Sequence, residues 1–525
     1  MKTAQAVVLL LFSLPSLEAP AQSAEPKTPS SKPPNIVFIL ADDLGFGDVA
    51  CYNPASKIPT PHLDKLAATG MQFLDAHSPA TVCSPTRLSL LTGRHSFRWK
   101  GGGRVFVGIG GPCQIEDGRL TLPQMLRNRG YATAAVGKWH VGLTFLDKQG
   151  NPITRKSHPD VKGMKRIGLV DFSRPIPDGP VNRGFDSFFG TACCPTTDTL
   201  YSYIVDDKIP NPPTKRSDKR KLPRHFYSLD CRGGMQSDDF DHEEVDMVFL
   251  KKSQEFLRNH VGTTPDKPFF LYHAMQAVHL PSFPAKQFQG KTKSGPHGDF
   301  IFEADFVVGE LMKTLKKLGV ADDTLVLFSS DNGPETPTVW HMRKEYQHDG
   351  SRPWRGVKRE VWEGGHRVPL IAHWPGHIEA GARSDQTISL VDMMATLGAI
   401  TGCALPDSAA EDSFDFKNVL LGKDDGKPVR EFTMQASWQG LSIRHGKWKY
   451  LEKPYKKRRK GKWVQSFLLP DTAPGHKGQL YDLEADPGET TNLYFKNPEM
   501  AKMLGEKLIQ NKEAGRSAPE RSLNR

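Results

Sequence analysis

The sequence predicts an α/β fold with a large, mixed and mainly parallel sheet flanked by helices, followed by a smaller C-terminal α+β subdomain. Continuous apolar runs are typical of strands that are buried on both faces, as in a parallel sheet. Amphipathic helical segments lie between these runs, and this alternation indicates a doubly wound α/β domain. After about residue 425, shorter alternating segments replace the pattern, which indicates the separate subdomain.

The first expected strand is the start of the fold at NIVFILADD (35–43), an apolar run that ends in two carboxylates. Similar runs recur at 131–137, 268–276, 324–333 and 368–376. Helices are expected between them at 120–130 and 300–319. In the second, Phe302, Phe306, Val307 and Leu311 keep a helical spacing, and Gly319 follows where a helix C-cap is expected.

Two segments depart from this alternation of strands and helices. Residues 147–235 are rich in Pro, Lys, Arg and Asp and are expected to form a long insertion over the sheet edge. Residues 426–515 contain two segments with the pattern of antiparallel strands and a closing amphipathic helix. The expected organisation is a signal peptide, a linker, a main domain and a C-terminal subdomain, at 1–24, 25–34, 35–425 and 426–515.

The N-terminus has the order of a secretory signal: Lys2, an apolar run from Ala6 to Leu14, and small residues at 19–24. A buried N-terminal helix is the alternative. The apolar run is too short for a stable membrane anchor. Because the chain lacks Asn-x-Ser/Thr sequons, we expect a bacterial periplasmic or secreted protein rather than a lysosomal one. Seven cysteines leave at least one outside any intramolecular disulfide scheme.

The chain is basic, with 70 Lys and Arg against 59 Asp and Glu, a formal net charge of +11. A basic surface attracts polyanions, which include nucleic acids, anionic lipids and sulfated or phosphorylated substrates. The run KKRRKGK (456–462) reads first as a solvated loop and second as a docking surface for an anionic polysaccharide. Nucleic-acid binding is not expected, because no recognition motif accompanies this run.

Oxygen ligands follow two of the expected strands. Asp42 and Asp43 follow the first strand, and Asp331 and Asn332 follow the strand at 324–330. Ligands in open α/β sheets bind beyond the carboxyl ends of the strands, so these four side chains are expected to meet. Crowded carboxylates repel one another unless a cation lies between them, and oxygen ligands suit Ca²⁺ or Mg²⁺ better than zinc. The sequence therefore predicts a metal site.

The segment TVCSPTRLSLLTGRH (81–95) is the most specific motif. Its Cys83-Ser84-Pro85-Thr86-Arg87, followed by LTGR (91–94), resembles the signature of the type I sulfatases of the alkaline phosphatase superfamily. The segment from Gly130 to His140, which ends in GKWH, resembles the second signature of that family, and HLP (279–281) resembles its H-x-P. Lys358 resembles the Lys that precedes its E-G-G segment. The resemblance covers roughly residues 35–510 and implies an alkaline-phosphatase-like fold.

The resemblance also implies a chemistry. Cys83 would be oxidised to Cα-formylglycine by a formylglycine-generating or equivalent sulfatase-maturing enzyme, and its hydrate would be the nucleophile. Asp42, Asp43, Asp331, Asn332 and residue 83 would hold one Ca²⁺. Arg87 and Lys138 would orient the nucleophile, His140 would hydrogen-bond its second hydroxyl, and His279 and Lys358 would grip the sulfate.

The expected activity is therefore a sulfuric ester hydrolase that acts on a sulfated carbohydrate or an aryl sulfate. Two alternatives stay open. One is a phosphonate or phosphate ester hydrolase of the same superfamily, although zinc phosphatases use Ser or Thr nucleophiles and additional Asp or His ligands. The other is a polyanion-binding protein without activity, which is disfavoured because each expected catalytic position holds a competent residue.

Overall fold

The computed structural model describes residues 32–521 apart from 100–104, 106–108, 110, 230, 439 and 455–468. The expected signal peptide, most of the expected linker and the basic run 456–462 therefore lie outside the described residues. All seven cysteines are described and none forms a disulfide. Among the described residues, no helix is both long enough and apolar enough to cross a membrane.

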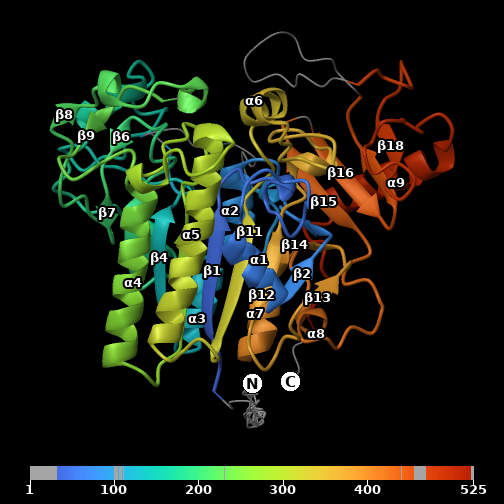
Figure 1. Ribbon diagram of the computed structural model, residues 1–525, viewed down its shortest axis with the longest axis horizontal. Helices are drawn as coiled ribbons and strands as arrows, with labels where there is room; N and C mark the ends of the chain where they lie inside the picture. The colour runs from blue at the N-terminus through green and yellow to red at the C-terminus, as the bar shows by residue number, and fades with distance from the viewer. Residues whose placement is uncertain are drawn as a thin grey trace, which may run out of the picture.

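A mixed sheet forms the centre of the molecule, with its strands lying side by side in Figure 1. Its order within the described residues is β13-β2-β12-β11-β1-β10-β4-β5-β7. These strands are β1 (Asn35–Ala41), β2 (Met71–Phe73), β4 (Ala132–Lys138), β5 (Ser187–Thr191), β7 (Ile204–Val205), β10 (Phe269–Ala274), β11 (Thr324–Ser330), β12 (Leu370–His373) and β13 (Ala382–Ser384). The five central strands β11, β1, β10, β4 and β5 pair in parallel. This arrangement confirms the predicted mainly parallel sheet.

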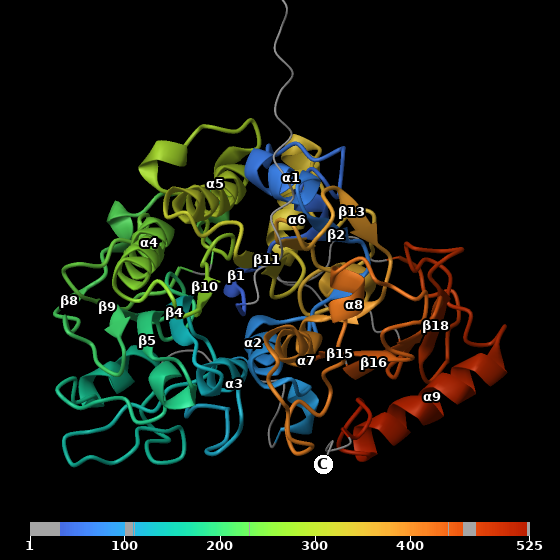
Figure 2. The ribbon, with the colours of Figure 1, turned by 90° about the horizontal axis from the view of Figure 1, so that it is seen from below.

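Helices cover both faces of the sheet, as the view from below shows (Figure 2). One face carries α1 (Pro61–Ala68), α4 (Val245–Thr263) and α5 (Gly295–Lys317), and the other carries α2 (Cys83–Thr92), α3 (Leu122–Asn128) and α7 (Met393–Thr401). Two further helices are α6 (Thr336–Tyr346) and α8 (Lys417–Leu420). The central strands are largely apolar because their alternate side chains enter one or other of two buried cores.

The structure corrects two details of the sequence interpretation. The run at 368–376 forms β12, which is antiparallel to β11 although it is buried like its parallel neighbours. Residues 147–235 do not all lie outside the sheet, because β5 pairs in parallel with β4 and β7 pairs with β5. The rest of that segment includes a three-stranded sheet of β6 (Leu200–Tyr201), β8 (Lys215–Arg216) and β9 (Met235–Gln236).

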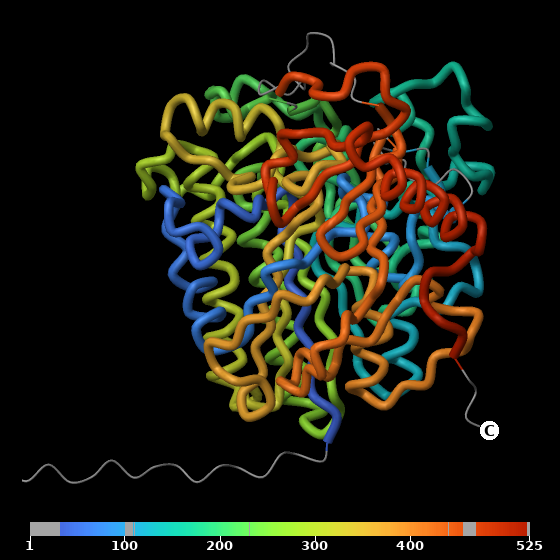
Figure 3. The backbone as a smooth tube through the Cα atoms, turned by 90° about the vertical axis from the view of Figure 1, so that its right-hand side faces the viewer, coloured from blue at the N-terminus to red at the C-terminus, as the bar shows by residue number. Residues whose placement is uncertain are grey.

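The C-terminal residues form the predicted α+β subdomain. Its antiparallel sheet consists of β15 (Thr433–Ser437), β16 (Gly440–His445), β17 (Trp448–Leu451) and β18 (Gln479–Asp482), and α9 (Pro498–Glu513) packs against it (Figure 3). The small pair β3 (Ala76–His77) and β14 (Ile388–Ser389) lies in the main domain. Strand β15 also contacts the chain before α2, since the Thr81 amide donates to the Ala436 carbonyl. The subdomain thereby supports the segment that leads into Cys83.

Candidate active site

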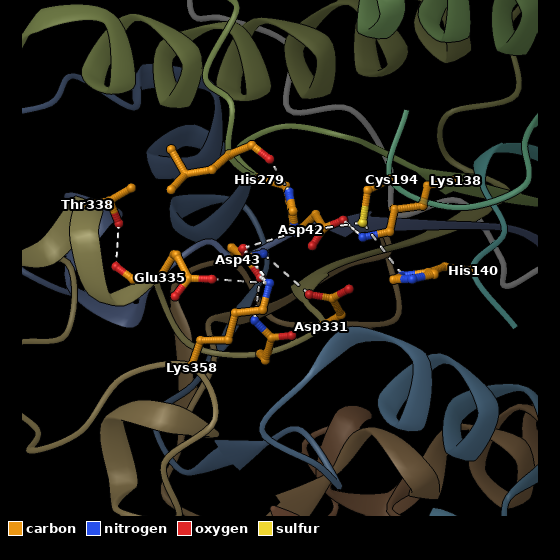
Figure 4. Close-up of polar contacts among 12 residues, drawn as sticks. Asp42, Asp43, Lys138, His140, Cys194, His279, Asp331, Glu335, Thr338 and Lys358 are labelled. Atoms are coloured by element: carbon orange, nitrogen blue, oxygen red, sulfur yellow. Dashed lines mark hydrogen bonds and ion pairs between the residues drawn. The ribbon is translucent and has the colours of Figure 1, made fainter. Parts of the chain in front are cut away.

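The predicted cation ligands meet at the carboxyl end of the sheet. Strands β1 and β11 are adjacent and in register from Asn35 and Thr324 to Ala41 and Ser330, so the residues that follow them emerge side by side (Figure 4). The amide nitrogen of Asn332 donates to Oδ1 of Asp43 at 2.7 Å, and the backbone N–H of Asp43 faces Oδ1 of Asp331 at 3.3 Å. All four side chains are buried.

This oxygen cluster has the properties of a cation site. Oδ1 of Asp42 and Oδ1 of Asn332 are buried and have no hydrogen-bond donor. Burial and the neighbouring Asp42 carboxylate raise the pKa of Asp331 to about 7, despite the opposing charge of Arg87. Potential ligand atoms of Asp42, Cys83 and Asp331 lie within 4.8 Å of one another. Unpartnered buried oxygens and crowded carboxylates fit a hard cation such as Ca²⁺.

Cys83 is the first residue of α2 and is buried beside these carboxylates. The positive end of the helix dipole favours negative charge at this position. One turn further along the same helix, Arg87 forms an ion pair with Asp331 at 2.8 Å and donates to the Lys138 carbonyl at 2.9 Å. The spacing of four residues in the motif therefore puts both side chains on one face of α2.

Lys138 and His140 come from the end of β4. Gly137 adopts a φ of +116°, and a Cβ atom there would overlap the Ala274 carbonyl of β10, so only glycine fits before Lys138. The Lys138 ammonium contacts Oδ2 of Asp42. This contact and the other nearby cations hold the pKa of Asp42 below its usual range, although burial alone would raise it.

His279 and Lys358 complete the set of predicted residues. Nε2 of His279 lies 3.7 Å from Oδ2 of Asp43, and the Lys358 ammonium lies 2.6 Å from Oδ1 of the same carboxylate. All the predicted site residues therefore converge on one buried centre. Asp43 and His140 adopt left-handed backbone conformations, with φ of +61° and +56°. Such conformations cost about 1 to 3 kcal/mol in residues with a side chain and are concentrated at functional sites.

Three residues of the centre were not predicted from the sequence: Cys194, Glu335 and Arg359. Cys194 follows β5 and lies near both histidines, with Sγ 3.9 Å from Nδ1 of His140 and 3.6 Å from Nε2 of His279. Glu335 lies 3.7 Å from the Lys358 ammonium and pairs with Arg359. The short apolar run that forms β5, which Cys193 and Cys194 follow, is the sequence signal for a further strand beside the site, within the segment predicted as an insertion.

The comparisons with known proteins agree on one family. The family model described as Sulfatase matches residues 34–403. An N-acetylgalactosamine-6-O-sulfatase of Bacteroides thetaiotaomicron is 32% identical over 517 residues, which cover 91% of this chain and 93% of that protein. Human arylsulfatase A is 31% identical, with 88% and 84% covered. A solved structure from work on glycosaminoglycan metabolism by Bacteroides thetaiotaomicron has a TM-score of 0.75 at 30% identity, covering 92% of this chain and 100% of that one.

Proposed function

The chain belongs to the sulfatase family and is a sulfate ester hydrolase, and we propose that its substrate is a sulfated carbohydrate cleaved with a formylglycine formed from Cys83 and a bound Ca²⁺. The observation that carries the proposal is the convergence of Cys83 with Asp42 and Asp331 at the carboxyl end of the sheet. A thiol buried among carboxylates is a poor nucleophile toward sulfur. An aldehyde hydrate at the same position supplies one hydroxyl to take up the sulfuryl group and a second to expel sulfate.

Asp42, Asp43, Asp331 and Asn332 would hold the cation, whose positive charge would offset the negative charge of the sulfate oxygens. Arg87 is fixed by Asp331 and the Lys138 carbonyl, so its guanidinium has little freedom to reorient during the reaction. Together with Lys138, it would hold the nucleophile in place. Fixed cations of this kind contribute by preorganisation, because the protein does not rearrange as charge develops.

The two histidines have separate roles in the proposal. His140 would hydrogen-bond the second hydroxyl of residue 83 and take its proton when sulfate leaves. His279 would face the departing alcohol, and Nδ1 of its ring donates to the Leu280 carbonyl, which orients the ring with Nε2 toward the site. Lys358, buried between Asp43 and Glu335, would bind a sulfate oxygen and assist departure of the alcohol.

The carbohydrate substrate is proposed on three grounds. A relative at 32% identity across nearly all of both chains is named for a sulfated amino sugar. The similar solved structure comes from work on glycosaminoglycans. The net charge of +11 favours anionic substrates. We further propose that the chain is exported by its N-terminal segment, and that a sulfatase-maturing enzyme acts on Cys83 before or during export.

The test is to co-express the chain with a sulfatase-maturing enzyme and to measure, by mass spectrometry, the mass of the peptide that contains residue 83. We expect the mass of formylglycine and reaction with a carbonyl reagent, together with sulfate release from at least one sulfated saccharide. Cys83→Ala should fold normally and release no sulfate, while Cys403→Ala, outside the site, should keep the activity. An intact Cys83 thiol in fully active enzyme would contradict the mechanism.

Parallel assays separate the substrate proposal from its alternatives. We expect sulfate esters of sugars to be cleaved in preference to phosphate and phosphonate esters. Release of sulfate from aryl sulfates alone, with none from any sulfated glycan, would contradict the carbohydrate proposal but leave the sulfatase activity standing. Faster cleavage of a phosphonate monoester than of every sulfate ester would favour the phosphonate hydrolase instead.

A further inference from the structure

We propose that the chain, before Cys83 is converted, binds a divalent transition-metal ion of the zinc class through Cys83, Cys194 and His140, with His279 as the fourth donor. This site adjoins the oxygen cluster of Asp42, Asp43, Asp331 and Asn332, and the ligand atoms of Cys83 and His279 also lie within 4.8 Å of carboxylate oxygens of that cluster. It needs only the thiol that the sequence encodes at position 83, so it does not rest on the formylglycine mechanism.

The positions of the donor atoms carry the proposal. Ligand atoms of Cys83, His140 and Cys194 lie within 4.8 Å of one another. Sγ of Cys194 lies 3.9 Å from Nδ1 of His140 and 3.6 Å from Nε2 of His279. Tetrahedral zinc with Zn–S of about 2.3 Å and Zn–N of about 2.0 Å separates its sulfur and nitrogen ligands by about 3.6 Å. The distances from Sγ of Cys194 to the two histidine nitrogens, 3.9 and 3.6 Å, are close to this ligand-to-ligand separation.

Three of the donors, Cys83, His140 and Cys194, already lie together in the fold, and His279 lies beside Cys194. The four side chains are buried and come from four places in the fold, namely the start of α2 and the segments that follow β4, β5 and β10. Nδ1 of His279 donates to the Leu280 carbonyl, which leaves Nε2 facing Sγ of Cys194 (Figure 4). A ring fixed in this way by its other nitrogen is the usual arrangement for a metal-binding histidine.

The donor types separate this site from the neighbouring oxygen cluster. Thiolates and imidazoles select zinc-class ions, whereas Ca²⁺ takes oxygen ligands. The positive charge of the Lys138 ammonium acts on Cys83 and Cys194 and opposes a bound cation, and its contact with Asp42 offsets that charge. Cys83 lies where the two clusters meet. A metal held by the Cys83 thiolate would withhold that thiolate from oxidation, so zinc binding and conversion would exclude each other.

The test uses the full-length chain produced without a maturing enzyme, with the Cys83 thiol verified by mass. The reduced protein, in excess Ca²⁺, is titrated with Co²⁺, whose spectrum reports thiolate ligands and tetrahedral geometry, and Zn²⁺ is then added in competition. We expect one Co²⁺ per chain, thiolate-to-cobalt charge-transfer absorption, and complete displacement by Zn²⁺. Cys194→Ser should lose one thiolate contribution and weaken Zn²⁺ binding by more than the roughly 100-fold that loss of a supporting contact costs.

Cys193→Ser is the matched control, because it removes the adjacent buried thiol outside the donor set and should leave the spectrum unchanged. As a second readout, Zn²⁺ should slow alkylation of Cys83 and Cys194 but not of Cys231. Absence of thiolate-to-cobalt absorption, or equal Zn²⁺ affinity in Cys194→Ser and the parent chain, would overturn the proposal. Neither result bears on sulfatase activity, which is measured on the converted protein.

Discussion

The Lys358 ammonium lies 2.6 Å from Oδ1 of Asp43, although 315 residues separate the two in the chain. Asp43 also accepts a hydrogen bond from Asn332, so one buried carboxylate connects the expected cation site to the residue expected to bind sulfate. The contact requires the loop before β12 to fold over the end of β1. It makes Lys358 a fixed charge at the centre of the site.

Replacing that charge is therefore expected to affect turnover. Lys358→Met should lower kcat/KM for a sulfate ester by about 100- to 1000-fold, the usual cost of removing one preorganised electrostatic contact. Lys358→Arg should recover part of the loss, and the exposed Lys344→Met on α6 should have no effect. Sulfate release by Lys358→Met at the parental rate would show that Lys358 is structural.

Removal of the divalent cation should lower both activity and stability. A ligand at 100 times its Kd stabilises the folded state by about 2.7 kcal/mol, so a chelator should lower the denaturation midpoint and re-added Ca²⁺ should restore it. In Asp43→Ala the chelator should change neither quantity, whereas Asp266→Ala, at an exposed position, should respond like the parent protein. A parent protein that is equally active and stable in chelator has no such site.

A buried ion cluster joins the C-terminal sheet to the main domain. The Lys449 ammonium contacts Glu363 at 2.9 Å and Glu489 at 3.0 Å, and all three side chains are fully buried. Lys449→Met leaves two buried carboxylates short of a partner and should cost about 3 to 5 kcal/mol of folding free energy. Lys447→Met, whose side chain is 45% exposed beside Asp482, should cost less than about 1 kcal/mol. Equal urea midpoints for the two variants would contradict this difference.

Acid should destabilise the protein through its buried histidines. Burial lowers the pKa of His273, on β10, from 6.5 to about 3, so the folded state keeps this ring neutral. Below pH 6.5 the unfolded chain binds a proton that the folded chain does not, and stability falls by up to about 1.4 kcal/mol for each pH unit. His273→Gln should reduce this slope, while the exposed His62→Gln should not. Identical slopes in the parent and His273→Gln would contradict the assignment.

The sequence by itself determined the fold class and the positions expected to carry chemistry. Strands β1 and β11 are mostly apolar and are each followed by carboxylates, a local pattern that predicts buried parallel strands with polar groups beyond their ends. The spacing of Cys83 and Arg87 likewise fits one face of a helix, and α2 has them there. Such features can be predicted because they depend on residues that are neighbours in the chain.

Only the tertiary structure decided which distant residues share the centre and how the strands pair. Cys194 reaches His279 because β5 joins the main sheet, and the short apolar run that forms β5 indicates a buried strand but not the sheet that this strand joins. The direction of β12 also cannot be predicted from the sequence, because a strand buried on both faces has the same apolar composition whether it pairs in parallel or antiparallel. Periodicity reports burial, whereas pairing and site composition depend on contacts between residues far apart in the chain.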